Sequence, residues 1–127
     1  MFSLLARIFT WWIEATTGTW LMTWWRGELV GGDEFGNRYY RHKDGDRRWV
    51  IYHGGVEASR VPPEWHAWLH RMVAKPPSEQ PMLTRPWEKA HRPNATGTDQ
   101  AYLPPGHLGR GGERDPATGD YEPWRPQ

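Results

Sequence analysis

The first 25 residues place their polar side chains at helical spacing. On a wheel of about 100° per residue, Ser3, Arg7, Thr10 and Glu14 fall on one narrow stripe. The other positions form an apolar arc of roughly 200°, made of Phe2, Leu4, Leu5, Ile8, Phe9, Trp11, Trp12 and Ile13. Such an arc is wide enough to sink into the boundary of a bilayer or into a protein groove. We therefore predict an amphipathic helix over residues 1–25.

The aromatic residues of this helix favour a membrane interface, where tryptophan is enriched. A membrane-spanning helix needs about 20 consecutive apolar residues, and here Arg7, Glu14 and the polar run 16–19 interrupt the apolar sequence. A helix buried against a partner protein remains an alternative. The predicted membrane-interface residues are Phe9, Trp11, Trp12, Trp24 and Trp25.

Residues 27–54 change to the short alternating runs of β-strands. We predict strands over Gly27–Gly32, Asn37–Lys43 and Arg47–His53, with the dipeptide Asp44-Gly45 as a hairpin signal between the last two. In the third strand both faces carry large apolar groups, so each face needs a cover. One cover is the helix that follows, and we expect the second to come from outside the chain.

That helix begins at two prolines and carries the run VPPEWHAWLHRM, residues 61–72. Proline is favoured in the first turn of a helix, and Glu64 suits the positively polarised N-terminus. One stripe of roughly 140° contains Trp65, Trp68, Leu69, Met72 and Val73. Its tryptophans are predicted to pack the helix on the sheet or on a neighbouring protein.

From residue 75 to residue 127 the chain holds ten of its twelve prolines and shows no sustained helical or strand period. Its apolar residues are widely spaced, which suits an extended segment that docks in successive pockets better than it suits a core. A solvated tail without partners is the alternative. The predicted partner-anchoring residues are Trp65, Trp68, Trp87, Tyr102 and Trp124. The whole pattern predicts an α+β chain in three parts, residues 1–25, 27–74 and 75–127.

Composition narrows the classes of function. Ten tryptophans in 127 residues are far above ordinary usage, whereas the absence of cysteine excludes disulfides, zinc thiolates and thiolate nucleophiles. The formal net charge of +1 is far from the broad positive field of a protein that binds duplex nucleic acid. These numbers favour a tryptophan-rich binding module.

Candidate catalytic and metal sites are weak. His66 and His70 have the spacing of two metal ligands, but a zinc site needs at least three protein ligands, and both histidines lie at the edge of the tryptophan stripe. The glycines and acidic residues of segment 31–36 and of the Asp44–Asp46 turn are better explained by turn geometry than by phosphate binding or acid–base chemistry. We predict no catalytic, cofactor or metal residue.

A single-strand nucleic-acid platform is the rival function from another class. The runs Arg38-Tyr39-Tyr40-Arg41 and Arg47-Arg48-Trp49 combine aromatic rings, which stack on bases, with arginines, which follow phosphates. The balanced charge and the absence of an RNP-like motif count against it.

Three motifs, GELVGGDEFGNRYY, RRWVIY and especially VPPEWHAWLH, closely resemble an accessory-subunit family of respiratory complex I, the proton-pumping NADH:ubiquinone oxidoreductase. The eukaryotic member is named for its seventeen-kilodalton size. The resemblance runs through residues 29–77 and resumes in the tail at ATGT, residues 95–98, and at Tyr102-Leu103-Pro104. It implies a non-catalytic subunit without iron–sulfur cluster, flavin or quinone chemistry, which stabilises and helps assemble the peripheral arm.

The resemblance also implies partners and a location. The expected partners are the iron–sulfur subunits of the quinone-reducing module, with a zinc-bearing accessory subunit as a further one, on the cytoplasmic face of a bacterial inner membrane. The compact loops between Tyr40 and Trp49 and between Tyr52 and Val61, with no Arg- and Ser-rich transit peptide at the start, indicate a bacterial member. An assembly-factor paralogue is the nearest alternative within the family.

Overall fold

The computed structural model describes residues 15–126. By its internal contacts the chain divides into two units, one that ends at Asn94 and one that begins at Ala95. The first unit contains helix α2 (Thr17–Arg26), strands β1 (Gly27–Gly32), β2 (Arg38–His42) and β3 (Arg48–Ile51), the 3-10 turn η1 (Ala58–Arg60) and helix α3 (Pro63–Leu69). The predicted α+β class is confirmed, with strand bounds within about two residues of the prediction.

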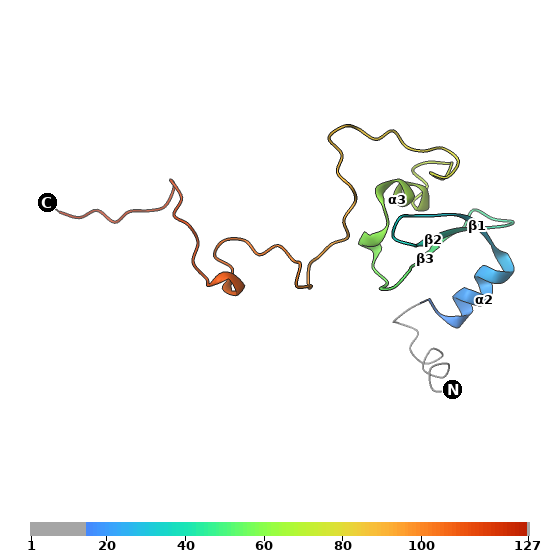
Figure 1. Cartoon of the computed structure of the whole chain (residues 1–127), viewed down its shortest axis with the longest axis horizontal. Helices are drawn as coiled ribbons and strands as arrows, with labels where there is room; N and C mark the ends of the chain where they lie inside the picture. The colour runs from blue at the N-terminus through green and yellow to red at the C-terminus, as the bar shows by residue number, and fades with distance from the viewer. Residues whose placement is uncertain (1–14, 127) are drawn as a thin grey trace, which may run out of the picture. The chain divides into compact units, whose positions relative to one another are not determined.

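The three strands form an antiparallel meander in the order β1-β2-β3 (Figure 1). Between Leu29 and Gly31 the register of β1 shifts, so Val30 is the extra residue of a β-bulge opposite Tyr39 and Tyr40. The hairpin between β2 and β3 is present, although its loop is longer than a two-residue Asp-Gly turn. His42 N–H donates to the carbonyl of Arg47 at 2.8 Å, which encloses the residues between them.

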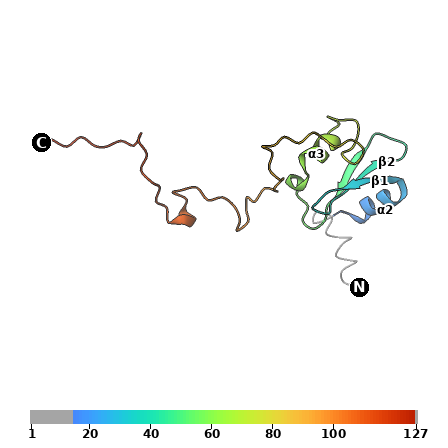
Figure 2. The ribbon, with the colours of Figure 1, turned by 45° about the horizontal axis from the view of Figure 1, so that its top comes forward.

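Helices α3 and α2 lie on opposite sides of the sheet (Figure 2). We expected the second cover to come from outside the chain, but α2 supplies part of it. The indole Nε1 of Trp49 donates to the hydroxyl of Thr23 on α2 at 3.0 Å, and Thr23 is itself buried. A hydroxyl of α2 thus satisfies the polar end of a large aromatic side chain of β3.

Helix α2 begins inside the segment that we predicted as one continuous helix. The hydroxyl of Thr16 accepts from the backbone N–H of Thr19 at 3.2 Å, so Thr16 is an N-cap and the helix starts at Thr17. The polar run 16–19 is therefore a helix start, in addition to an interruption of the apolar sequence. Residues 1–14, which include Phe9, Trp11 and Trp12, lie outside the described residues.

Helix α3 ends earlier than its apolar stripe suggested. The backbone N–H of Met72 donates to the carbonyl of Ala67, and that of Arg71 donates to the carbonyl of Trp68, which together form a Schellman motif. Arg71 takes the left-handed conformation that this motif requires, with φ of 60°. The chain therefore leaves the helical path, and Met72, predicted to lie on the packed stripe, is 73% exposed.

The segment after α3 returns along the first unit (Figure 1, yellow). Ser78 donates its hydroxyl to the carbonyl of Val30 at 3.0 Å. Further along, the ring of His91 hydrogen-bonds the carbonyl of Ser59 at 2.7 Å, and the N–H of Asn94 donates to the Ser59 hydroxyl. The boundary predicted at residue 75 therefore falls before the division into two units.

The second unit consists of short local turns. Its one helical turn among the described residues is η2 (Leu108–Arg110), which His107 caps by accepting from the N–H of Gly109. Arg110 donates to the carbonyl of Leu103 at 2.9 Å, and Arg114 pairs with Asp120. That ion pair lowers the pKa of Asp120, together with the N–H of Ala117. The described tail residues form no strand, as the absence of a sequence period predicted.

Candidate partner-binding surface

The two tryptophans of α3 lie in the core of the first unit. Trp65 stacks on Tyr39 with ring centroids 4.0 Å apart and planes at 3°, and it meets Trp68 edge to face at 5.8 Å. Trp65 and Trp68 are only 4% and 2% exposed. We predicted that these tryptophans pack either on the sheet or on a neighbouring protein. In the structure they pack on the sheet.

A glycine in the β1 bulge makes room for this packing. A methyl group at Gly31 would lie 2.8 Å from the ring of Trp65 and 3.3 Å from Ser78. The indole therefore lies directly against the backbone of β1, and the returning segment closes the other side. The glycines of segment 31–36 thus include one needed for close packing, a role that sequence spacing alone did not distinguish from turn formation.

Asp33 organises a buried polar network beside this core. One of its oxygens accepts from the N–H groups of Phe35 and Asn37, and the other accepts from the Asn37 amide at 2.8 Å and the Tyr39 hydroxyl at 2.7 Å. The side-chain oxygen Oδ1 of Asn37 in turn accepts from the N–H of His53 at 3.0 Å. Burial, followed by the hydrogen bond to Asp33, strongly raises the pKa of Tyr39. The network supports the prediction of turn chemistry for Asp33, but we had not predicted its partner Asn37.

Arg48 fixes the end of α3 to the sheet. Its guanidinium donates to the carbonyls of Trp68 at 2.6 Å and Val73 at 3.1 Å, and it lies 5.0 Å from the Trp68 ring centroid. Asp46 pairs with Arg48 and also with Arg71, at 2.7 Å in the second case. These charges hold the Schellman turn in place.

The arrangement of the β2 side chains counts against a base-stacking platform. Tyr39 is fully buried toward α3, whereas Tyr40 stacks on Trp49 on the opposite face, at 6.1 Å. Arg41 pairs with Glu28 at 2.9 Å, and this pair lowers the pKa of Glu28 and raises that of Arg41. The aromatic rings thus do not share one exposed surface on which successive bases could stack.

His66 and His70 are exposed and their rings lie close together. The centroids are 4.1 Å apart, which fits adjacent turns of a helix. Among residues 15–126 no group of three or more histidines, cysteines or acidic residues is arranged to hold a metal ion.

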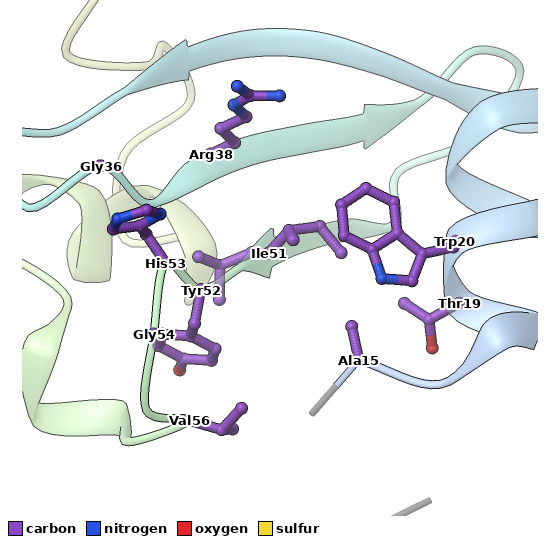
Figure 3. Close-up of a pocket in the computed structure, with 11 residues that line it drawn as sticks. Ala15, Thr19, Trp20, Gly36, Arg38, Ile51, Tyr52, His53, Gly54 and Val56 are labelled. Atoms are coloured by element: carbon purple, nitrogen blue, oxygen red, sulfur yellow. The ribbon is translucent and has the colours of Figure 1, made fainter. Parts of the chain in front are cut away.

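A cavity of about 430 Å³ opens on the α2 face of the sheet (Figure 3). Trp20 of α2 lies on one side of it, with Ile51 and Tyr52 across from Trp20 and with Arg38 and His53 further along. The described lining contains no carboxylate.

Exposed aromatic side chains occupy two other regions. On α2, Trp24 and Trp25 are 80% and 65% exposed, and among the described residues no helix is both long and apolar enough to cross a bilayer. After α3, the predicted anchors Trp87, Tyr102 and Trp124 are all at least 75% exposed. These side chains are available for contact with a surface outside the chain, in contrast to Trp65 and Trp68.

A family model described as NADH ubiquinone oxidoreductase subunit NDUFA12 matches residues 27–126. The chain belongs to this family. The resemblance found in its motifs is thus confirmed, and the match runs through the tail as well as the sheet and α3.

Curated relatives agree with the family assignment. The chain is 41% identical to NADH dehydrogenase (ubiquinone) 1 alpha subcomplex subunit 12 of Dictyostelium discoideum over 87 residues, and 42% identical to the Bos taurus protein of the same name over 92 residues. The matches cover 65% and 61% of this chain and 63% of each relative, so the chain spans a little under two thirds of their length. An uncharacterized protein of Rickettsia prowazekii is 35% identical over 69 residues, covering 50% of this chain and 67% of that protein, which fits a bacterial member.

Proposed function

We propose that this chain is a non-catalytic accessory subunit that stabilises and helps assemble the peripheral arm of a proton-pumping NADH:quinone oxidoreductase. Membership of a family described as a subunit of that enzyme supports this proposal. The chain has no cysteine, and its described residues include no group of three or more side chains that could hold a metal ion. Both observations fit a chain that contributes contacts rather than redox centres.

The observation that carries the proposal is the state of the tail. Residues 95–126 have almost no regular structure, yet the family match includes them and their aromatic residues are exposed. A segment of this kind gains little from folding on itself and can bind by inserting separate anchors into pockets of a partner. Large aromatic side chains commonly supply most of the binding energy in such contacts.

The proposed partners are the iron–sulfur subunits of the quinone-reducing module, with a zinc-bearing accessory subunit as a further neighbour. The proposed location is the cytoplasmic face of a bacterial inner membrane, with α2 at the bilayer boundary. Tyr102 and Trp124 are the proposed anchors of the tail, and Trp87 is a further proposed anchor in the segment that precedes it. Trp65 and Trp68 act indirectly by keeping α3 on the sheet.

A truncation tests this function. Because residues 75–94 contact the sheet and η1, the tail should be removed after Asn94, which leaves the first unit with its own contacts. We expect the truncated chain to be lost from NADH:quinone oxidoreductase purified in mild detergent and the arm to dissociate more readily. Full retention of the truncated chain and unchanged arm stability would contradict the role of the tail.

An intact-length variant separates side-chain anchoring from tail length. Replacement of Tyr102, Tyr121 and Trp124 by serine keeps the backbone and should reproduce most of the loss. A wild-type chain that never co-purifies with membrane-bound NADH dehydrogenase activity would refute the subunit role itself. The assembly-factor alternative predicts association with incomplete arms and absence from the mature enzyme.

A further inference from the structure

The ion pairs of the first unit are distributed unevenly over the two faces of the sheet. Among the described residues, Arg41 pairs with Glu28 and Glu79, and Asp46 pairs with Arg48 and Arg71. All of these lie on the face or the end that carries α3, because Arg41 and Arg48 are register partners on the same side as Tyr39. The carboxylates that form these ion pairs, Glu28, Asp46 and Glu79, therefore lie beside α3.

The α2 face is basic. His42 and Arg47 continue the alternation on that side, and Arg26 and Lys43 adjoin them at the junction of α2 with β1. None of these four side chains has a carboxylate partner among the described residues. Residues 15–27 contain no acidic residue, and the acidic residues of the hairpin loop, Asp44 and Asp46, are both exposed.

Three of these cations are held at the C-terminal end of α2. Lys43 Nζ donates to the carbonyl of Trp25 at 3.2 Å, the Arg26 guanidinium lies 4.8 Å from the Trp25 ring centroid, and Arg47 contacts the sulfur of Met22 at 3.8 Å. Cations near the C-terminal end of a helix are stabilised by the helix dipole. Arg26 and Arg47 make no described hydrogen bond to a carbonyl or carboxylate, so their positive charge remains available to an anion.

A groove of about 330 Å³ lies among these groups. Its apolar side consists of Leu21, Met22 and Trp25, and its basic side consists of Arg26, His42 and Arg47. The groove thus has the two-sided chemistry of a phospholipid, with cations for a phosphate and an apolar wall for the glycerol and the first acyl carbons.

The exposed side of α2 continues that apolar wall. Trp20, Leu21, Trp24 and Trp25 lie on one arc of roughly 140° on a helical wheel, and each is at least 50% exposed. Tryptophans beside arginine and lysine are typical of segments that lie in the interface of a bilayer. A helix of ten residues is about 15 Å long, half the thickness of the hydrocarbon layer, so it can lie on a bilayer but cannot cross one.

We propose that the groove between α2 and the β2–β3 hairpin binds the phosphate headgroup of an anionic phospholipid in a bilayer. Arg26 and Arg47 neutralise the headgroup, while Leu21, Trp24 and Trp25 enter the interfacial layer. The proposal deepens the membrane-boundary location proposed above by assigning a ligand class and a site.

Vesicle binding by the isolated full-length chain tests the site without the rest of the enzyme. We expect at least a tenfold stronger partition into phosphatidylcholine vesicles that contain phosphatidylglycerol than into pure phosphatidylcholine, and a steep loss with added salt. Equal partition into both vesicle types would overturn the proposal. Co-purification of the wild-type chain with the enzyme is measured separately. The vesicle result can therefore be interpreted even if the chain proves not to be a subunit of the enzyme.

A pair of double variants locates the effect. Arg26→Gln with Arg47→Gln removes two groove cations, and Lys89→Gln with Arg92→Gln removes the same charge from the exposed segment near residue 90. Each cation near an anionic surface contributes about a fivefold increase in partition, so the first variant should bind roughly 25-fold more weakly and the second less than about threefold. Equal losses would show a general charge effect and overturn the assignment of the groove.

Two further experiments test other occupants of the groove. Inorganic phosphate should not displace the chain from vesicles more than chloride does at equal ionic strength, and displacement by phosphate alone would make free phosphate the ligand. If Arg26→Gln with Arg47→Gln abolished retention in the detergent-purified enzyme but left vesicle binding intact, an acidic protein surface would be the occupant. Either of these results would overturn the lipid assignment.

Discussion

The tryptophans of α3 and those that follow α3 in the chain have opposite surroundings. Trp65 and Trp68 are almost fully buried against the sheet, whereas Trp87 and Trp124 are 75% and 82% exposed. The sheet and the segment that returns after α3 supply neighbours for the two indoles of α3. The described residues around Trp87 and Trp124 leave both rings exposed, so the same residue type stabilises the fold in one region and is available for binding in the other.

The largest expected effect on folding comes from the buried tryptophans. Trp68→Ala should lower the free energy of unfolding by about 3–5 kcal/mol, because it removes a large side chain from a packed site and leaves a cavity. Chemical denaturation of the isolated chain measures the change. Trp87→Ala is the matched control and should change the unfolding free energy by less than about 0.5 kcal/mol. Similar losses in both variants would show that Trp87 also belongs to the core.

The contact between the β1 backbone and Trp65 of α3 can be disrupted without removing an aromatic ring. Gly31→Ala should cost about 1–3 kcal/mol, because the added methyl group would overlap the Trp65 ring. Gly119→Ala is the control in the tail, where nothing lies within 4 Å of the added atom, and it should leave stability unchanged. A neutral Gly31→Ala would mean that the indole does not lie on the β1 backbone.

The Asp33 network gives the first unit a dependence on alkaline pH. Burial raises the pKa of Tyr39 in the folded chain above its value in the unfolded chain, so its protonated form stabilises the fold below the unfolded pKa of about 10. This contribution is lost progressively as the pH rises above that value. Denaturation at several pH values should therefore show a steeper alkaline loss in the wild type than in Tyr39→Phe.

The same variant has a smaller effect at neutral pH. Tyr39→Phe keeps the stacking on Trp65 but removes the hydrogen bond to Asp33, which should cost about 1–2 kcal/mol. Identical alkaline slopes for the two proteins would assign the loss to other groups, among which Tyr52 also has a pKa raised by burial.

The tail aromatics should have the smallest effect on folding and a large one on assembly. Trp124→Ala should leave the unfolding free energy of the isolated chain within about 0.5 kcal/mol of wild type. If the tail binds as proposed, the same variant should weaken incorporation into the enzyme by an amount that corresponds to about 2 kcal/mol or more. Comparison of denaturation with subunit retention separates the two roles, and unchanged retention would remove Trp124 from the anchors.

Much of the sheet could be predicted because its signals are local. The alternation of residues 27–54 and the Asp44-Gly45 dipeptide predicted three strands and a hairpin, and all are present. The bulge at Val30 and the longer hairpin loop could not be predicted in this way. The bulge depends on how β1 accommodates Trp65, and the loop depends on the hydrogen bond between His42 and Arg47. Neither contact has a signal in the local sequence pattern.

The candidate surfaces were only partly predictable. The aromatic stripe of α3 was evident from helical spacing, but spacing does not say whether a stripe meets the chain's own sheet or a partner. The groove beside α2 had no sequence signal, since Leu21 and Arg47 lie on separate elements. Their proximity follows from the junction of α2 with β1 and from the turn of the β2–β3 hairpin.

The sequence by itself determined the α+β class, the helix start at two prolines, the family and the lack of regular structure in the tail, because these depend on local spacing, turn residues and motifs. Only the tertiary structure decided which tryptophans are buried, where α3 ends, and which face of the sheet carries cations that have no carboxylate partner among the described residues. Those properties depend on contacts between residues far apart in the chain, such as Tyr39 with Trp65 and Arg48 with Trp68. The free energy of such contacts is set by the neighbours that the fold supplies.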